Sequence, residues 1–503
     1  MRNFLAGSLI VAFSLCFPFR GAAAEEGTSS WAQWHFLGAR HLARNAEGTD
    51  VRSVLAEPAT QAVLERALSG LARAAAADAE GAALVRSLFD ESLQVESLGA
   101  LGGPVGPTPS QWTVALRVGS DRVQHWMDRW SKVGASVGLP QTKTARAGDW
   151  FLGGLGRDQA PDLKPLEDRL ADALSRPSSP DAPWLEVRTG LGHVANALDW
   201  SPGLPWPVMQ ATVVGRGPNL RTTARLEFER PFELTLDPWR LPTHTVREPL
   251  ISFAAVRGLQ PWMEAHPMWR ELEWPAPNQL FVWARSLAPY ATEFAWPLPG
   301  AGERIEAAAP RLPAALRARL PWLDFGEVKF LAPLKRLVWQ GFPILVPYIN
   351  PAADDGLVTA GIFPVAADRE PAPAELYAEV QGRTNLLYYH WELTQPRLGD
   401  WESLTGMYAM LARHQPPATN SVVVRWLQST NVTVHLGNCV TEISQVSPRE
   451  WRAVRTSAVG LTAFELHRLL RWIDGEQFPR RTPPRPALGV RTDTSPAEPA
   501  PQP

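Results

Sequence analysis

A recurring alternation of short strand and amphipathic helix is the feature that most limits how this chain can fold. In the clearest copy, residues 112–118 place apolar side chains at every second position, a period that predicts a strand with one buried face. A small-residue turn, Gly119-Ser120, follows. Apolar side chains then recur at helical spacing through residues 123–133, which predicts a helix with one continuous apolar stripe. That stripe has to pack on a sheet.

Three looser copies of the same unit follow along the chain. They begin at residues 184–187 with a helix from Leu191, at 250–256 with a helix from Leu259, and at 385–391 with a helix from Leu398. In the last copy Leu398, Trp401, Leu404, Tyr408 and Leu411 fall close to helical periodicity, which predicts one buried helix face.

Antiparallel hairpins separate these copies. Residues 208–214 return through 215–219 as 220–228, and one face of the second strand carries Arg221, Thr223, Arg225 and Glu227. A face of this kind is typical of a strand that is wet on one side. We therefore expect an α+β fold of repeated strand-helix-hairpin modules, with mixed or antiparallel sheets and helices packed on one face.

The expected domain organisation follows from composition. Residues 1–24 resemble a signal peptide, 25–101 a mainly helical segment, 112–300 one α+β module and 301–478 a second, possible duplicate of the first. Residues 479–503 are rich in proline without apolar periodicity and are expected to be a disordered tail. Near the chain's end, Thr462 and Glu465 form a capping-box pattern that predicts a helix, and Gly475 marks its expected end.

The N-terminal pattern predicts export. Arg2 precedes an apolar run over residues 5–19, and Ala22-Ala23-Ala24 supplies small residues for cleavage near Ala24. The mature chain is then expected in the periplasm or outside the cell. Removal of Cys16 leaves only Cys439, so no intramolecular disulfide can form and the fold depends on its core.

The net charge and the lack of known motifs argue against several classes of function. With 49 Lys and Arg against 51 Asp and Glu, the formal charge is −2, which argues against a nucleic-acid binder. No metal or cofactor motif is evident, and no later segment predicts a membrane-spanning helix. The 22 tryptophans are expected mainly in the core, with a platform for stacking carbohydrate as the alternative.

Several residues resemble catalytic motifs without their expected context. Ser136 lies within Gly134–Gly138 in a G-x-S-x-G pattern, but the predicted helix precedes it instead of following it. His390 and Glu392 form an H-x-E pattern without the paired cysteines of a zinc deaminase. We expect Ser136 at a helix-ending turn, and Glu392 in an ion pair with Arg397.

A thiol-imidazole pair is the next candidate. If Gly437-Asn438 is a two-residue hairpin turn, Leu436 lies opposite Cys439, and His435 and Cys439 point to opposite faces. Cys439 is then expected to be a buried, inert thiol, with His435 facing outward.

The acidic residues leave open the alternative that the protein is a hydrolase. Asp354-Asp355 is expected in a turn, and Asp400, near Glu402, in the first turn of a helix, where the helix dipole stabilises a carboxylate. Glu392 and Asp400 could serve as a catalytic pair only if the fold brought them together.

Residues 385–394 with Arg397, Leu398 and Trp401 resemble a stretch found in uncharacterised exported bacterial proteins. Residues 249–253 with 258–262, and 277–281 with Trp283, are similar to the same family. The resemblance spans most of residues 30–475 and implies export and a shared fold, with no assigned activity, ligand or catalytic residue.

The sequence thus predicts an exported, non-catalytic binding or scaffold protein of the cell envelope, with no catalytic, cofactor-binding or metal-ligating residue assigned. An envelope component or polysaccharide is a possible partner. The alternatives are an extracytoplasmic hydrolase that uses carboxylates such as Glu392 or Asp400, and a receptor that binds carbohydrate or lipid on exposed tryptophans.

Overall fold

The structure is a computed structural model. It describes residues 30–102, 110–176, 179, 182–192, 206–265, 267–286, 291–319, 326–341, 346–354, 356–363, 369–411, 421–476 and 478–479. The expected signal peptide and nearly all of the proline-rich tail lie outside the described residues.

Among the described residues, the first half of the chain has eight strands and six helices with described bounds. In chain order they are β1 (Ala32–Phe36), α2 (Ala39–Arg44), α3 (Thr49–Ala56), α4 (Pro58–Ala75), α5 (Ala79–Gln94), β2 (Ser97–Gly102), β3 (Gln111–Arg117), α6 (Ser120–Ser136), β4 (Gln141–Ala147), β5 (Trp150–Gly156), α7 (Lys164–Ser175), β6 (Leu185–Gly190), β7 (Val208–Arg216) and β8 (Asn219–Glu227).

The second half repeats this alternation of strands and helices. Its elements are β9 (Leu250–Arg257), α9 (Gln260–Ala265), α10 (Pro267–Leu272), β10 (Gln279–Arg285), β11 (Thr292–Pro297), α11 (Ala301–Ala308), α12 (Leu312–Arg319), β12 (Glu327–Leu331), β13 (Arg336–Gln340), β14 (Tyr348–Pro351), β15 (Leu357–Gly361), α13 (Ala374–Gln381), β16 (Leu386–Leu393), α14 (Thr394–Leu411), α15 (Val422–Gln428), α16 (Thr430–Thr433), β17 (Asn438–Ser447), β18 (Glu450–Ser457) and α17 (Ala463–Asp474).

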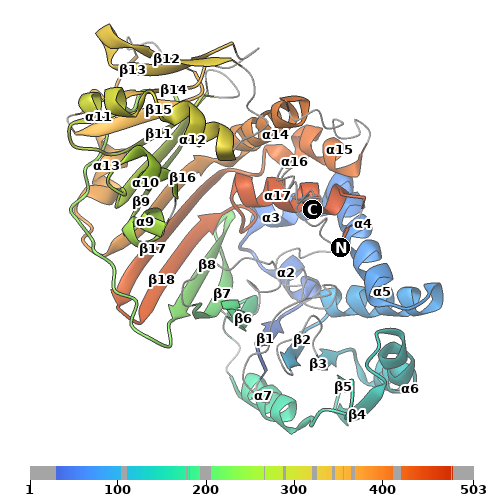
Figure 1. The fold of residues 1–503 in the computed structure, drawn as a ribbon. Helices are drawn as coiled ribbons and strands as arrows, with labels where there is room; N and C mark the ends of the chain where they lie inside the picture. Colours follow the sequence, from blue (N-terminus) through green and yellow to red (C-terminus); the bar gives the residue numbers. More distant parts are fainter. Residues whose placement is uncertain are drawn as a thin grey trace, which may run out of the picture.

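All these strands pair into one antiparallel sheet, and the protein has an α+β fold (Figure 1). The strand pairings give the order β4-β5-β3-β2-β1-β6-β7-β8-β18-β17-β16-β9-β10-β11-β15-β14-β13-β12. The pair β8–β18, which we call the seam, joins the two halves through eight register pairs from Leu220↔Ser457 to Glu227↔Glu450.

Strand order is nearly symmetric about the seam. Leaving the seam, β7, β6, β1, β2 and β3 on one side correspond to β17, β16, β9, β10 and β11 on the other. In both halves the strand-to-helix turn uses glycine at positive φ: Gly38 follows β1 and Gly258 follows β9. Only glycine adopts this backbone conformation without strain. In strand order, the second half begins at β9, ahead of the boundary expected at residue 301.

Helices lie on both faces of the sheet, although most share one face. On that face α6 packs Trp126 and Trp130 against Phe151 of β5. On the opposite face α7 packs Leu166 on Leu98 and Leu152, and α13 packs Tyr377 on Phe253. Helices α7 and α13 precede the equivalent strands β6 and β16. Between them the centre of that second face, which we call the polar face, carries the alternating polar residues of the β7–β8 hairpin.

Tryptophan packing on this sheet depends on strand glycines. Trp130 is fully buried, its Nε1 donates to the Gly154 carbonyl at 3.0 Å, and its ring lies 2.5 Å from where a Cβ on Gly153 would stand. We expect Gly153→Ala to lower the free energy of unfolding by about 1–3 kcal/mol through overpacking, measured by urea denaturation.

The matched control is Gly399→Ala in α14, where a Cβ would meet nothing within 4 Å. This change is expected to be neutral or to stabilise by about 0.5–1 kcal/mol, because alanine is the better helix former. Equal effects of the two substitutions would contradict the packing described.

Candidate ligand-binding site

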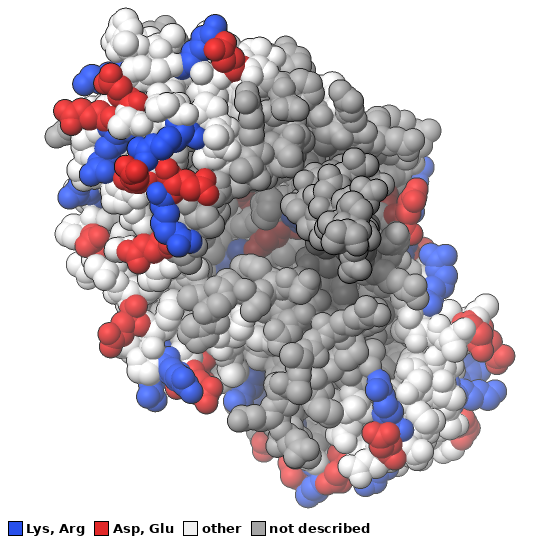
Figure 2. All heavy atoms as spheres, viewed as in Figure 1, with Lys and Arg blue, Asp and Glu red and all other residues white. Residues whose placement is uncertain are grey.

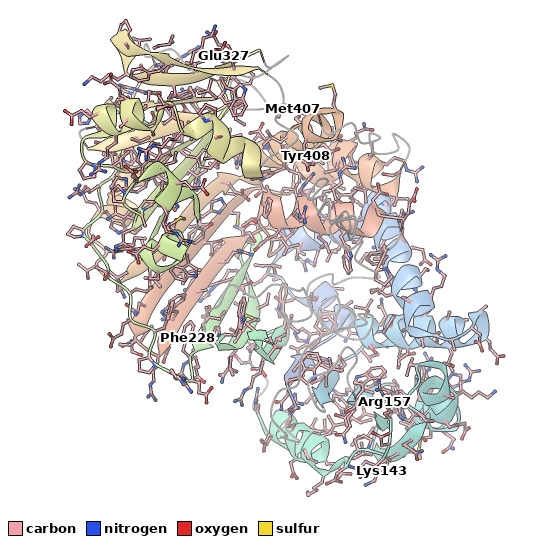
Figure 3. All side chains as sticks on the ribbon, in the orientation of Figure 1. Lys143, Arg157, Phe228, Glu327, Met407 and Tyr408 are labelled. Carbon is pink, nitrogen blue, oxygen red and sulfur yellow. The ribbon has the colours of Figure 1, made fainter. Side chains whose placement is uncertain are left out.

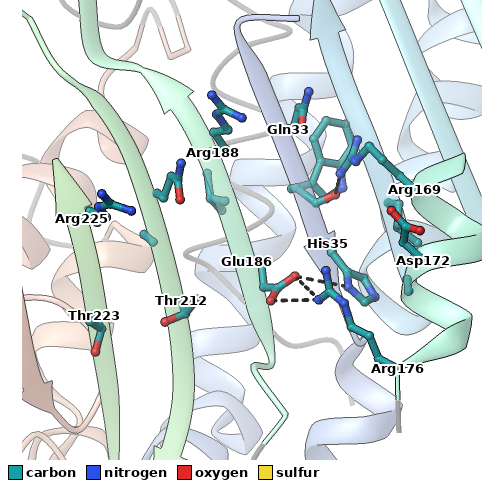
Figure 4. A pocket seen from close by; sticks show the side chains of 16 residues that line it. Gln33, His35, Arg169, Asp172, Arg176, Glu186, Arg188, Thr212, Thr223 and Arg225 are labelled. Atoms are coloured by element: carbon teal, nitrogen blue, oxygen red, sulfur yellow. Dashed lines mark hydrogen bonds and ion pairs between the residues drawn. The ribbon is translucent and has the colours of Figure 1, made fainter. Parts of the chain in front are cut away.

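A cavity of about 480 Å³ opens on the polar face beside α7 (Figure 4). Strands β1, β6, β7 and β8 form its floor and α7 one wall. Because antiparallel register partners share a face, His35, Glu186, Thr212 and Thr223 project together from four neighbouring strands. Gln33, Arg188, Gln210 and Arg225 form the next row. The volume falls within the range of small-molecule sites.

An ion-pair network organises the α7 side of the cavity. His35 Nε2 lies 3.0 Å from Glu96 Oε1, His35 Nδ1 lies 3.8 Å from Glu186 Oε2, and Arg176 of α7 lies 3.0 Å from the same Glu186 oxygen. Burial lowers the pKa of His35, but the hydrogen bonds that its ring donates to Glu186 and Glu96, with the negative charge of both carboxylates, outweigh burial and hold the pKa above its usual value. The His35 contact, with Arg176, lowers the pKa of Glu186 to about 2. Glu186 is therefore ionised and cannot serve as a general acid at neutral pH.

Two arginines of this cavity differ in what they contact. Arg169 is anchored, because its guanidinium donates to the carbonyls of Gly99 (3.1 Å) and Trp34 (3.0 Å). Arg188 is exposed, and no described residue accepts a hydrogen bond from it or forms an ion pair with it. Its donors are thus available to a bound anion.

A second cavity, of about 360 Å³, lies across the seam on the same face. Arg383 forms a bidentate pair with Glu442, with both N–O distances 2.8 Å. Arg221 of β8 and Arg452 of β18 also line the cavity, and no described residue accepts a hydrogen bond from either. Asn385 and Ser444 add an amide and a hydroxyl.

Arginine dominates the charge of the two cavities. Their lining residues include seven arginines and three carboxylates, although the whole chain carries a formal charge of −2. Elsewhere, in the view of Figure 2, charged side chains of both signs are interspersed. The polar face therefore favours an anionic ligand by charge complementarity.

Glu392 lines neither of these cavities. It is 1% exposed, and its Oε1 accepts a 2.6 Å hydrogen bond from the backbone N–H of Ala463, the first residue of α17. Burial raises the pKa of Glu392 to about 7 despite that hydrogen bond and the charge of Arg397. His390 is also buried, and burial, together with the positive charges of Arg455 and Arg397, lowers its pKa to about 4.

Arg397 pairs with Asp400, not with Glu392 as the sequence predicted. The Arg397–Asp400 distance is 3.3 Å, and the guanidinium also contacts Thr292 at 3.0 Å and lies over the Trp401 ring. Since α14 begins at Thr394 rather than Leu398, Asp400 lies beyond the first turn, so the expectation of a first-turn carboxylate was wrong. Burial raises the pKa of Asp400 to about 6.

The stripe predicted for α14 is only partly buried. Leu398 is buried as expected, whereas Tyr408 is 47% exposed and lies beside the buried Met407 (Figure 3). The prediction of a buried Tyr408 was wrong, because the face of α14 that carries this side chain is not covered there by another described element.

The prediction of a hairpin around Gly437 was also wrong. Residues 430–433 form the short helix α16, and β17 begins at Asn438 and pairs with β16, so Leu436 does not lie opposite Cys439 in a hairpin. His435 lies 3.5 Å from Asp50. The burial predicted for Cys439 is confirmed at 0% exposure, and burial raises the pKa of its thiol to about 12.

This burial has a direct chemical consequence. We expect Cys439 in the native protein to resist a bulky maleimide at pH 8, and to react promptly in 6 M guanidinium chloride. Mass spectrometry after each incubation checks this. Stoichiometric labelling of the folded protein would contradict the burial of the thiol.

The remaining motif residues have structural contacts. Ser136 ends α6 as predicted, and its hydroxyl donates to the Lys132 carbonyl at 2.7 Å. Asp354 accepts hydrogen bonds from the backbone of His244 and the hydroxyl of Thr245; Asp355 lies outside the described residues. The predicted capping box of Thr462 and Glu465 is confirmed.

A buried network centred on Glu293 was not predicted from the sequence. Its Oε2 accepts from Trp283 Nε1 at 2.8 Å and from Arg285, and its Oε1 accepts from the Tyr348 hydroxyl. Alternating residues of β11 could have indicated it, because Glu293 occupies a position on the same face as Ala295.

Most of the described tryptophans are core residues. Twelve are buried and the others are partly buried, so no fully exposed indole ring supports the carbohydrate-stacking alternative in this part of the chain. No group of acidic, histidine or cysteine side chains among the described residues could hold a metal ion. Within the same residues, no helix is long and apolar enough to cross a membrane.

Comparisons with known proteins add little. No family model and no curated protein matches the chain. Solved structures that match include crystal forms III, I and IV of TP0453, at 11%, 10% and 10% identity, which cover 41%, 43% and 40% of this chain and 80%, 78% and 78% of TP0453. The TM-scores are 0.24, 0.23 and 0.23. A likeness this weak carries no argument.

Proposed function

We propose that this protein is an exported, non-catalytic binding protein that holds an acidic saccharide on its polar face. Export is supported by the apolar run and small-residue site within residues 1–24. The observation that carries the ligand class is the cavity beside α7, in which exposed arginines lie next to side chains that hydrogen-bond hydroxyl groups.

The chemistry of the floor fits a saccharide bearing carboxylates. Arg188 offers a planar pair of donors to a carboxylate. Gln210, Thr212 and Thr223 offer the amide and hydroxyl groups that sugar hydroxyls require. A ligand that carries both carboxylates and hydroxyl groups can form hydrogen bonds with all of these side chains.

Binding without catalysis is supported by the state of the carboxylates. A glycoside hydrolase needs one protonated and one ionised carboxyl group across a cleft. In the cavity, Glu186 is held ionised by His35 and Arg176. Glu392 and Asp400 have the raised pKa of an acid, but they are buried and engaged by the Ala463 backbone and Arg397. Glu392 and Asp400, the carboxyl groups with a raised pKa, are thus not among the residues that line the cavity.

Calorimetric titration of the mature protein with trigalacturonate in low salt tests the proposal. Wild type should bind it, and Arg188→Gln should weaken binding about tenfold or more, since a hydrogen bond to a charged group contributes about 1.5–3 kcal/mol. Arg188→Lys should retain part of the affinity.

Arg40→Gln is the matched control, because Arg40 is an exposed arginine of α2 on the opposite face of the sheet. It should bind like wild type. Maltotriose, which has no carboxylate, should bind far more weakly. Equal affinity for the two sugars, or equal loss in the two arginine variants, would refute the proposed function.

A further inference from the structure

We infer that the two cavities form one trough across the seam, and that its occupant is a linear acidic polysaccharide that contacts both halves of the chain at once. This inference rests on the proposed function and extends it from the cavity beside α7 to the whole centre of the polar face.

The two cavities meet on a single strand. Strand β8 contributes Thr223 and Arg225 to the cavity beside α7, and Arg221 to the cavity across the seam. These three alternate residues share one face of β8, so the two linings are continuous there.

Two arginines face each other across the seam in a way that destabilises the sheet. Arg225 and Arg452 are direct register partners on β8 and β18, and like charges directly opposite each other destabilise a strand pair. Arg225 is compensated, because its guanidinium lies 3.0 Å from Glu227 and 2.8 Å from Glu450. Arg452 is exposed and has no such partner among the described residues. A bound anion would supply the missing charge.

The repeat adds another arginine to the same face of the seam, four residues along β8 from Arg225. Arg221 is the third residue of β8, and Arg452 is the third residue of β18. Each follows a hairpin turn, so the two arginines occupy equivalent places in the two halves. With Arg188 on β6, they form a series of exposed or half-exposed guanidinium groups that crosses the seam.

The dimensions favour a chain over a single small anion. From β6 to β17 the trough crosses four strand spacings, about 19 Å at roughly 4.8 Å each. Its floor adds Asn385 and Ser444 to the amide and hydroxyl groups beside α7. Exposed aromatic side chains, on which nucleic-acid bases would stack, are absent from the described lining. A linear sugar chain with repeated carboxylates matches both the length and the groups.

Titration with galacturonate oligomers of increasing length tests this inference. An octamer should bind with one-to-one stoichiometry and at least tenfold more tightly than the trimer, because its second contact is intramolecular. Arg452→Gln and Arg221→Gln should weaken the octamer at least fivefold and leave the trimer unchanged, whereas Arg188→Gln should weaken both. Arg452→Lys should rescue part of the loss, and all variants should keep the wild-type midpoint of thermal unfolding.

The outcomes separate the two proposals. If the trimer binds with dependence on Arg188 but the octamer gains nothing, or if Arg452→Gln leaves the octamer unaffected, the trough is refuted and the proposed function stands. If neither oligomer binds, both fail. Tighter, Arg452-dependent binding of polyphosphate, polyglutamate, DNA or anionic lipid vesicles than of the octamer would refute the polysaccharide as occupant.

Discussion

Replacing Glu293 by alanine should lower the free energy of unfolding by about 3–5 kcal/mol, because it leaves the buried guanidinium of Arg285 without its carboxylate. Glu293 is 7% exposed and Arg285 is 2% exposed. The change also removes the acceptor of Trp283 Nε1 and of the Tyr348 hydroxyl. Urea denaturation followed by tryptophan fluorescence measures the loss.

Tyr348→Phe is the control for this network. It removes one hydrogen bond and leaves the Arg285–Glu293 pair intact, so we expect a loss of about 1–2 kcal/mol. Burial and the neighbouring Glu293 charge raise the pKa of Tyr348, so its hydroxyl remains a donor at neutral pH. A Glu293→Ala protein within about 1 kcal/mol of wild type would show that the network is not intact in solution.

Glu392→Gln should change the pH dependence of stability. Its pKa is raised from 4.5 to about 7 in the folded protein. A raised pKa stabilises the folded state fully below the unfolded value, and that contribution is lost as pH rises through 7. Glutamine cannot ionise, yet its side-chain carbonyl can still accept from the Ala463 N–H. Relative to wild type, the variant should therefore gain about 3 kcal/mol between pH 4.5 and pH 8.

Glu186→Gln provides a control of opposite sign. The pKa of Glu186 is lowered to about 2, so its contribution to stability is present above the unfolded value and is lost as pH falls towards 2. Relative to wild type, this variant should lose stability between pH 2 and pH 4.5, and the difference should then stay constant until His35, whose pKa Glu186 helps to raise, begins to titrate. A constant difference between Glu392→Gln and wild type from pH 4.5 to 8 would mean that Glu392 is not buried as described.

Local patterns in the sequence predicted the local structure well. The alternation of residues 112–118, the helical stripe of 123–133 and the Thr462/Glu465 capping box are properties of a few adjacent residues, and β3, α6 and α17 form where they indicate. The hairpin of β7 and β8 and its polar face were predicted for the same reason. Residues 430–436 misled the prediction because Val432, Thr433 and Val434 are β-branched, whereas burial of Val432 beside α15 stabilises a helical turn.

The site depends on pairings that no local pattern contains. Arg225 and Arg452 become neighbours only because β8 pairs with β18, which lies more than 200 residues later. Each arginine alone resembles an ordinary surface residue on a strand. The alternation of Arg221, Thr223 and Arg225 was visible, but the second cavity was not, because it needs the register of β17 and β18 against β8. The helices on the polar face, α7 and α13, were likewise not distinguished from those on the other face.

Arginine footprinting tests the central claim most directly. The protein without residues 1–24 would be treated briefly with phenylglyoxal, with and without polygalacturonate, and each modified arginine would be quantified by mass spectrometry. The account predicts that the polymer shields Arg188, Arg221 and Arg452 while Arg40 and Arg73 react unchanged. Two results would contradict this account. One is that saturating polymer leaves the modification of the three strand arginines unaltered, and the other is that it shields only arginines on the face opposite the polar face.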